Sequence, residues 1–137
     1  MPEMTAAERD AFLRETRIAK LAYLTATGAP TIVPVWFEWD GEAARVFTSR
    51  RSRKAKRIAA DPRVALSVEE PVGVPERWVT IEGTCEIGAD GVVPLIERLA
   101  RRYYEPERAE QAIRDWTRTP AMWVALTIRP VRVLSSR

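Results

Sequence analysis

Six short apolar segments, separated by turn signals, constrain the fold of this chain more than any other feature. Each segment is rich in the β-branched, aliphatic or aromatic residues that strands prefer. Gly28-Ala29-Pro30 and Asp40-Gly41 mark the first two turns. The segments span residues 17–25, 31–39, 44–49, 64–69, 77–87 and 122–134. So many short strands predict a mainly β protein.

Four helical segments accompany these strands. Thr5 and Glu8 fit a capping box at the start of a first helix. Ser52 is the expected N-cap of a second helix, which must end before Asp61-Pro62 because the residue before a proline is pushed out of the α region. The other two helices are expected near residues 92–99 and 106–116.

The order of these elements decides between two sheet architectures. In a doubly wound parallel sheet, strands alternate regularly with helices. Here three strands precede the helix at Ser52, and two helices gather before the last strand. An antiparallel barrel fits better, because closure removes edges that such apolar strands would leave unpaired. We therefore expect a single domain over residues 1–137 with a mainly β fold: a six-stranded antiparallel barrel with peripheral helices.

The chain has no histidine and a single cysteine, Cys85. Without histidine there is no Ser-His-Asp triad, no imidazole general base and no histidine-ligated zinc or haem. We expect no metal site, and we expect Cys85 to be a small buried hydrophobe. Neither a secretory leader nor an apolar run long enough to span a membrane is evident. A cytoplasmic protein with no membrane partner is the expectation.

A basic run at residues 50–57 is the strongest local signal, with six Arg or Lys side chains in eight residues. Such runs are usually solvated surfaces. However, Arg50, Arg51, Arg53 and Lys54 surround Ser52, and the partial positive charge of a helix N-terminus disfavours cations there. Free amides, a serine hydroxyl and converging cations are what a phosphate site requires. The position therefore favours an anion site over a merely solvated face.

Two kinds of phosphate compound fit such a site. A nucleic-acid backbone can bind along a basic stretch that lies near exposed aromatic residues. The net charge is only +3, however, and no second dense basic run follows. We therefore expect no nucleic acid and favour the phosphate of a cofactor.

The residues around the basic run resemble a known family. Residues 47–55, which read Phe-Thr-Ser-Arg-Arg-Ser-Arg-Lys-Ala, closely resemble the strand-helix core of the pyridoxamine 5′-phosphate oxidase-like flavin-binding family, and the match continues through Ile58 and residues 61–64. Segments 33–41 and 76–83 resemble two further strands of that family. The likeness covers roughly residues 15–87, in matching order.

This resemblance implies a split β-barrel of the FMN-binding type, which forms a homodimer with the cofactor at the subunit interface. The segment that grips the cofactor phosphate is matched by Ser52, Arg53 and Lys54, with Arg50 beside them. The strands along the ribityl chain and ring system are matched by Val35, Trp36, Phe47, Thr48 and Ser49. Trp78 matches a position at the cofactor ring, where stacking would replace a polar contact.

One departure from the family bears on substrate and cofactor. True pyridoxamine 5′-phosphate oxidases are expected to hold their substrate with a C-terminal Arg-x-His arrangement, and this chain has no histidine. The short chain and the strand at residues 33–37 look more like a branch that uses the deazaflavin F420 or FMN. Arg50 and Arg51 suit the longer, polyanionic tail of F420, but an FMN protein can carry the same arginines. The expected cofactor is therefore F420 or FMN.

The resemblance predicts an oxidoreductase that transfers hydride between the cofactor and a small-molecule substrate. A cofactor or haem carrier without turnover is an alternative on the same fold, and nucleic-acid binding is a third. No general acid is evident: water, Tyr103 or no protein group can supply the proton.

The remaining aromatic residues and one proline carry separate expectations. We expect core or interface roles for Trp39, Trp116 and Trp123. Pro34, in the middle of a strand, predicts a sheet edge, a bulge or a backbone contact with a ligand.

Overall fold

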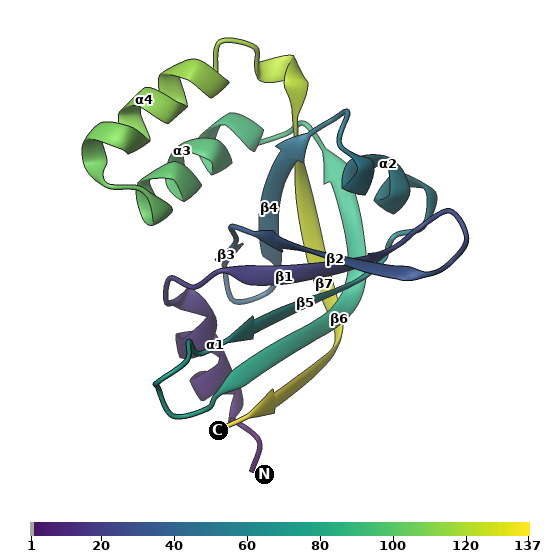
Figure 1. Cartoon of the computed structure of the whole chain (residues 1–137), viewed down its shortest axis with the longest axis vertical. Helices are drawn as coiled ribbons and strands as arrows, with labels where there is room; N and C mark the ends of the chain where they lie inside the picture. Colours follow the sequence, from purple (N-terminus) through teal and green to yellow (C-terminus); the bar gives the residue numbers. More distant parts are fainter. Residues whose placement is uncertain (1) are drawn as a thin grey trace.

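The computed structural model describes residues 2–137, which form a curled antiparallel sheet with helices around it (Figure 1). The strand order is β2-β1-β5-β6-β7-β4-β3, and every pair is antiparallel. The strands are β1 (Ala19–Leu24), β2 (Pro30–Val35), β3 (Glu38–Trp39), β4 (Ala44–Ser49), β5 (Arg63–Glu69), β6 (Trp78–Gly88) and β7 (Trp123–Ser136). The helices are α1 (Ala6–Arg14), α2 (Arg53–Ala60), α3 (Val92–Tyr103), α4 (Pro106–Trp116) and a 3₁₀ turn (Pro120–Met122). The mainly β antiparallel fold with peripheral helices is confirmed.

The structure has seven strands where the sequence predicted six, because segment 31–39 is divided. β2 ends at Val35, and the chain leaves the ladder at Trp36 and Phe37. The Phe37 side chain is fully buried in the barrel, and its amide donates to the Tyr103 hydroxyl at 3.3 Å instead of to a neighbouring strand. Tertiary packing thus overrides a run of strand-forming residues.

Both predicted N-caps are confirmed. Thr5 and Glu8 form a reciprocal capping box at the start of α1. The Ser52 side chain accepts a hydrogen bond from the Ala55 amide and begins α2, which ends at Ala60, directly before Asp61. Asp40-Gly41 turns the chain toward β4, with Gly41 at a φ of 99°. These local signals predict the helix starts well because capping is a matter of residues a few positions apart.

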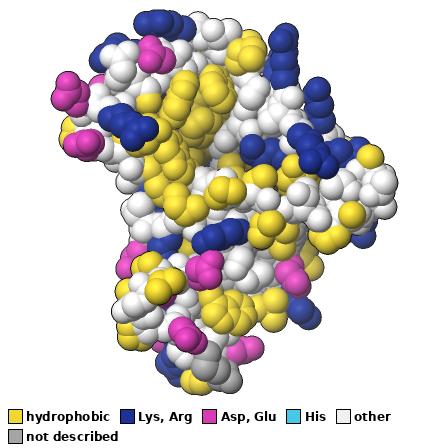
Figure 2. Space-filling view, viewed as in Figure 1, with side chains coloured by type: hydrophobic (Ala, Val, Ile, Leu, Met, Phe, Trp, Pro, Cys, Tyr) yellow, Lys and Arg dark blue, Asp and Glu magenta, His cyan; other side chains and the backbone are white. Residues whose placement is uncertain are grey.

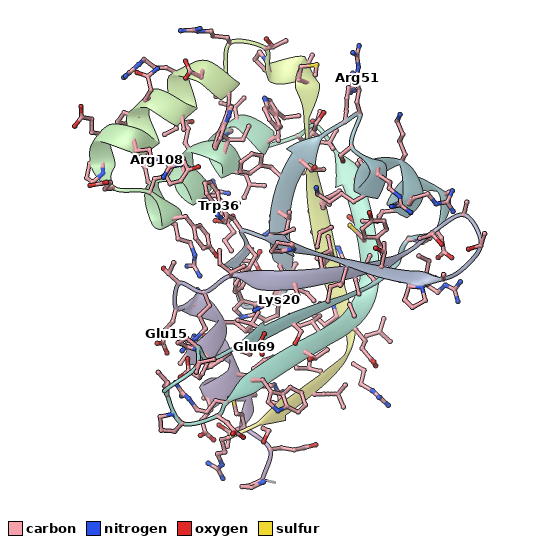
Figure 3. The ribbon with its side chains drawn as sticks, viewed as in Figure 1. Glu15, Lys20, Trp36, Arg51, Glu69 and Arg108 are labelled. Atoms are coloured by element: carbon pink, nitrogen blue, oxygen red, sulfur yellow. The ribbon has the colours of Figure 1, made fainter. Side chains whose placement is uncertain are left out.

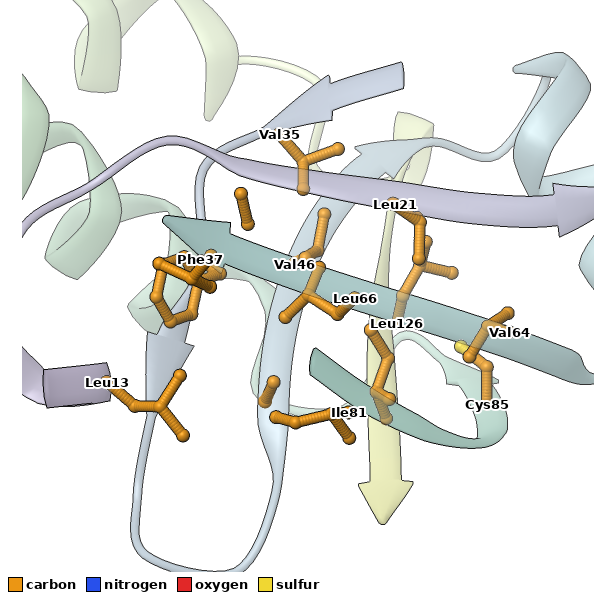
Figure 4. Packing of buried hydrophobic residues seen from close by; sticks show 14 of the residues in the cluster. Leu13, Leu21, Val35, Phe37, Val46, Val64, Leu66, Ile81, Cys85 and Leu126 are labelled. Carbon is orange, nitrogen blue, oxygen red and sulfur yellow. The ribbon is translucent and has the colours of Figure 1, made fainter. Parts of the chain in front are cut away.

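The barrel interior is one apolar cluster drawn from nearly every strand (Figure 4). Its fully buried side chains include Leu21, Phe37, Leu66, Ile81 and Leu126. Cys85 is buried in the same cluster, as expected, and burial raises the pKa of its thiol to about 12. A cysteine with that pKa stays protonated at neutral pH and is not a nucleophile.

The two long strands β6 and β7 connect the halves of the sheet. Their register shifts between Glu82 and Gly83. A Cβ at Gly83 would lie 2.1 Å from the carbonyl oxygen of Arg129, so only glycine permits this close approach. Outside the sheet, α1 packs against β3 and β6, and the α3–α4 pair stands over β4 at the opposite end (Figure 1). Among residues 2–137, none of the helices has the length and apolar character needed to cross a membrane.

Candidate functional site

An open pocket of about 540 Å³ lies where β2, β4 and α2 meet the α3–α4 pair. The side chains that line it are Ile18, Pro34, Val35, Trp36, Val46, Phe47, Lys54, Tyr104 and Trp116. A volume of this size is typical of sites for cofactors and drug-sized ligands. Figure 2 shows a band of hydrophobic side chains running over α3 and α4 into this hollow, and Lys and Arg side chains gathered over α2.

One wall of the pocket is aromatic. Trp36 stacks on Tyr103 with ring centroids 5.1 Å apart and packs edge-on against Tyr104 at 4.7 Å. Trp116 lies 6.0 Å from Trp36 and 5.7 Å from Phe47. Such pairs add stabilisation beyond the area that they bury. The wall is therefore a preformed apolar surface suited to a flat ring.

The wall is held in place by hydrogen bonds from its aromatic side chains. The Tyr103 hydroxyl donates to the carbonyl oxygen of Arg17 at 2.6 Å and accepts from the Phe37 amide. The Trp123 indole donates to the carbonyl oxygen of Trp116 at 2.8 Å. Because the proton of Tyr103 is committed to Arg17, this residue positions the wall and is not placed to protonate a substrate.

The start of α2 presents unused hydrogen-bond donors. Thr48, at the end of β4, donates to the Ser52 hydroxyl at 3.1 Å, and the Ala55 amide donates to the same oxygen at 3.2 Å. Ser52 accepts both bonds and retains its own proton for donation. Within residues 2–137 the amides of Arg53 and Lys54 have no acceptor. A helix start with free amides and a free hydroxyl binds anions.

Lys54 is the charged side chain that lines the pocket. It is half-buried, and among the described residues it has neither a hydrogen-bond acceptor nor a carboxylate within salt-bridge distance. Burial lowers the pKa of its ammonium group, because desolvation disfavours the charged form. An anion bound beside Lys54 would offset that cost.

The other cations of the basic run are also without acidic partners. Arg50, Arg51, Arg53 and Lys56 are exposed, and none of them forms a salt bridge within residues 2–137. Figure 3 shows Arg51 extending outward from the start of α2. Arg57 differs, because its guanidinium donates to the carbonyl oxygens of Leu24 and Thr25 and so ties α2 to the end of β1.

The structure brings most of the predicted site residues together. Val35, Trp36, Phe47 and Lys54 line the pocket. Thr48, Ser49 and Ser52 lie at the junction of β4 and α2, where Ser49 accepts from the amides of Arg51 and Ser52. Arg50 and Arg53 stand at the start of the same helix, outside the lining of the pocket. These residues surround one continuous region, although their contact with a cofactor stays a prediction.

Trp78 is not brought to this region within one chain. It lines a separate hollow formed by the loop at residues 69–77. Only a second copy of the chain could place Trp78 at the pocket, so its role remains a prediction that depends on dimerisation.

Sequence reasoning missed two aromatic residues of the pocket: Tyr104, which directly follows α3, and Trp116, the last residue of α4. We expected Trp116 to be structural, and it does pack against Trp123 at 6.2 Å while also facing the pocket. Pro34 lies in the edge strand β2, which confirms one of its three expected roles. It also lines the pocket, although a backbone contact with a ligand stays a prediction. Among the described residues, no cluster of three or more acidic or cysteine side chains could hold a metal ion.

Known proteins resemble both the sequence and the fold. Residues 5–132 match the family described as Pyridoxamine 5'-phosphate oxidase. A pyridoxine/pyridoxamine 5'-phosphate oxidase from Anaeromyxobacter dehalogenans is 32% identical over 123 residues, which cover 84% of this chain and 58% of that protein. An F420H(2)-dependent biliverdin reductase from Mycobacterium tuberculosis is 37% identical over 100 residues, or 70% of each chain. A solved structure described as F420 reductase superimposes with a TM-score of 0.74 at 27% identity, covering 97% of this chain and 98% of the other.

Proposed function

Because the chain belongs to the pyridoxamine 5′-phosphate oxidase family, we propose that it is an oxidoreductase whose cofactor is the deazaflavin F420 and whose substrate is a small organic molecule. The observation that carries this proposal is Lys54, an unpaired cation held at the edge of an aromatic pocket beside the free amides of α2. The resemblance to F420-dependent proteins supports the choice of cofactor.

The residues of the site fit a flavin-type group. A flat ring system requires an apolar surface, which Trp36, Phe47 and Trp116 provide. A phosphate requires donors and positive charge, which the Ser52 hydroxyl and Lys54 provide. The unpaired Arg50, Arg51 and Arg53 exceed what one phosphate needs, and this surplus suits the longer polyanionic tail of F420 better than FMN.

The chain's own contribution to the reaction is binding and exclusion of water. When bound, the cofactor supplies a hydride donor or acceptor. The aromatic wall is an apolar boundary on one side of the pocket, and the lower local dielectric there strengthens the attraction between Lys54 and an anion. The pocket is open on its other side, where a substrate can approach.

We also propose that the protein works as a homodimer. Among the described residues, the monomer exposes apolar surface at an edge of its sheet. Part of this surface is the edge strand β2, where Ile32 is 61% exposed. A second copy against this edge would cover the apolar strand and partly close the pocket. Sedimentation that shows only monomers at micromolar concentration would refute this.

Parallel titration of the apoprotein with FMN and with F420 tests the proposed cofactor. Because Trp36 and Trp116 line the pocket, binding should quench the protein's tryptophan fluorescence. We expect F420 to bind at least about tenfold more tightly than FMN, a difference of about 1.4 kcal/mol. Tighter binding of FMN would overturn the choice of F420, and no binding of either would overturn the cofactor site. Reduced cofactor that persists with every acceptor tried would favour a carrier.

A further inference from the structure

Lysine is scarce in this chain, and its three lysines stand in three different surroundings. Lys20, on β1, pairs with Glu69 at 2.7 Å, and Figure 3 shows these two side chains close together. Lys56 is exposed on α2 and does not line the aromatic pocket. Lys54, two residues earlier on the same helix, is half-buried and does line it. Lys54 is therefore the lysine whose amine a molecule in that pocket would meet.

The surroundings of Lys54 favour its neutral amine more than water does. Among residues 2–137, no carboxylate lies within salt-bridge distance of its ammonium group, and no acidic side chain lines the pocket. Burial also lowers its pKa, because desolvation disfavours the charged form. The charged form attracts anions, whereas the neutral form has a free electron pair. Proteins use lysine as a nucleophile toward carbonyl groups in such desolvated settings.

The walls of the pocket determine which carbonyl compounds suit this amine. Trp36, Phe47 and Trp116 line the pocket together with Lys54. The Trp116 ring centroid lies 6.0 Å from that of Trp36 and 5.7 Å from that of Phe47. A planar aromatic ring packs favourably against such side chains. The volume of about 540 Å³ admits a compound of two fused rings, and Figure 2 shows that the hollow is open to solvent on this face.

We propose that Lys54 is a covalent binding site for planar aromatic aldehydes, with which it forms a Schiff base. The Lys54 nitrogen attacks the carbonyl carbon, the neutral amine gives up its two protons, and the carbonyl oxygen leaves with them as water. A carbon–nitrogen double bond replaces the carbon–oxygen double bond, and nothing is oxidised or reduced. This inference goes beyond the proposed function, because it requires only the apoprotein and places the aldehyde where the cofactor would bind.

Reductive labelling of the apoprotein tests the inference. The protein is mixed with 2-naphthaldehyde and sodium cyanoborohydride, which reduces a Schiff base to a stable secondary amine. Mass spectrometry of the intact protein counts the adducts, and peptide fragmentation locates them. We expect Lys54 to be labelled at least about fivefold faster than Lys56, because the pocket holds the ring beside the amine. Propanal has no ring to pack against the wall and should show a smaller preference for Lys54.

Two matched variants identify the reacting amine. Lys54→Arg and Lys56→Arg each remove one amine from α2 and keep its positive charge. Lys54→Arg should lose the fast adduct and retain its melting temperature, whereas Lys56→Arg should keep the fast adduct.

Three results would overturn the inference: equal labelling rates at Lys54 and Lys56, an equal preference for Lys54 with both aldehydes, or a fast adduct that persists in Lys54→Arg. Cofactor binding is measured separately by titration. A failed titration would therefore count against the proposed function, while the labelling rates decide the role of Lys54.

Discussion

Two clusters of cations in this protein differ in whether they have acidic partners. Arg17 and Arg77 converge on Glu70 at distances of 2.7 and 2.8 Å, and the side chains of Arg17 and Glu70 are only 10% and 8% exposed. At the start of α2, Arg50, Arg53 and Lys54 have no carboxylate within reach in the described chain. The same kinds of side chain serve the fold in the first cluster and are left for a ligand in the second.

The surroundings of the two clusters explain the difference. Arg17 lies 3.8 Å above the Phe12 ring and donates to the Phe12 carbonyl, so the first cluster fastens α1 to the end of β5. The α2 cluster makes no comparable tie except through Arg57. Removing one member of a closed, buried network costs stability because a buried charge is left uncompensated, whereas charges that stay unpaired beside a pocket cost stability until an anion binds.

The largest expected effect on folding follows from removing the carboxylate of the closed network. Glu70→Ala removes the acceptor of the Arg17 Nε and of Arg77, so that Arg17 keeps only its bonds to the Phe12 carbonyl and to Glu15. We expect the free energy of unfolding to fall by about 2–3 kcal/mol. Urea denaturation measures this change. As a control, Glu86→Ala breaks the exposed pair with Arg129 and should cost less than about 1 kcal/mol. Equal losses in the two variants would contradict the distinction between the networks.

A smaller effect concerns the pH dependence of stability. Hydrogen bonds from Arg17 and Arg77 hold the pKa of Glu70 below its ordinary value of 4.5. A carboxyl with a depressed pKa stabilises the fold fully above its unfolded pKa, and this contribution is lost as the pH falls through the folded pKa. The stability gap between wild type and Glu70→Gln should therefore narrow below about pH 4.5. A gap that is the same at pH 6 and pH 3.5 would count against this role.

The smallest effect has the opposite sign and concerns the open cluster. Because burial lowers the pKa of Lys54, its charged form costs stability at neutral pH, and the cost disappears as the pH rises through the folded pKa toward 10.5. Lys54→Met should slightly raise the melting temperature of the apoprotein, and we expect its free energy of unfolding to rise by up to about 1 kcal/mol. As a control, Lys56→Met, at an exposed position of the same helix, should leave the melting temperature unchanged. A destabilised Lys54→Met variant would show that Lys54 serves the fold.

The sequence predicted the cationic side of the site, at the start of α2, better than its aromatic side. Ser52 and the surrounding cations could be identified because an N-cap and a basic run are local patterns, and the structure places them where β4 meets α2. Tyr104 and Trp116 could not be identified from the sequence, because their approach to Trp36 depends on how the α3–α4 pair packs over β4. The division of segment 31–39 was missed for the same reason: burial of Phe37 is a tertiary effect.

If the open cation cluster holds the anionic part of the cofactor, removing two of its cations must weaken cofactor binding, and the dissociation constant of a double variant measures this effect. Arg53→Ala/Lys54→Ala should weaken F420 binding about 100-fold, as the loss of two charge-assisted contacts predicts, while ligand-free stability is retained. The control Arg129→Ala/Arg132→Ala changes the net charge equally but removes two exposed arginines of β7 that pair with Glu86 and Glu82. It should bind like wild type. Unchanged affinity in the first variant, or equal losses in both, would contradict the claim.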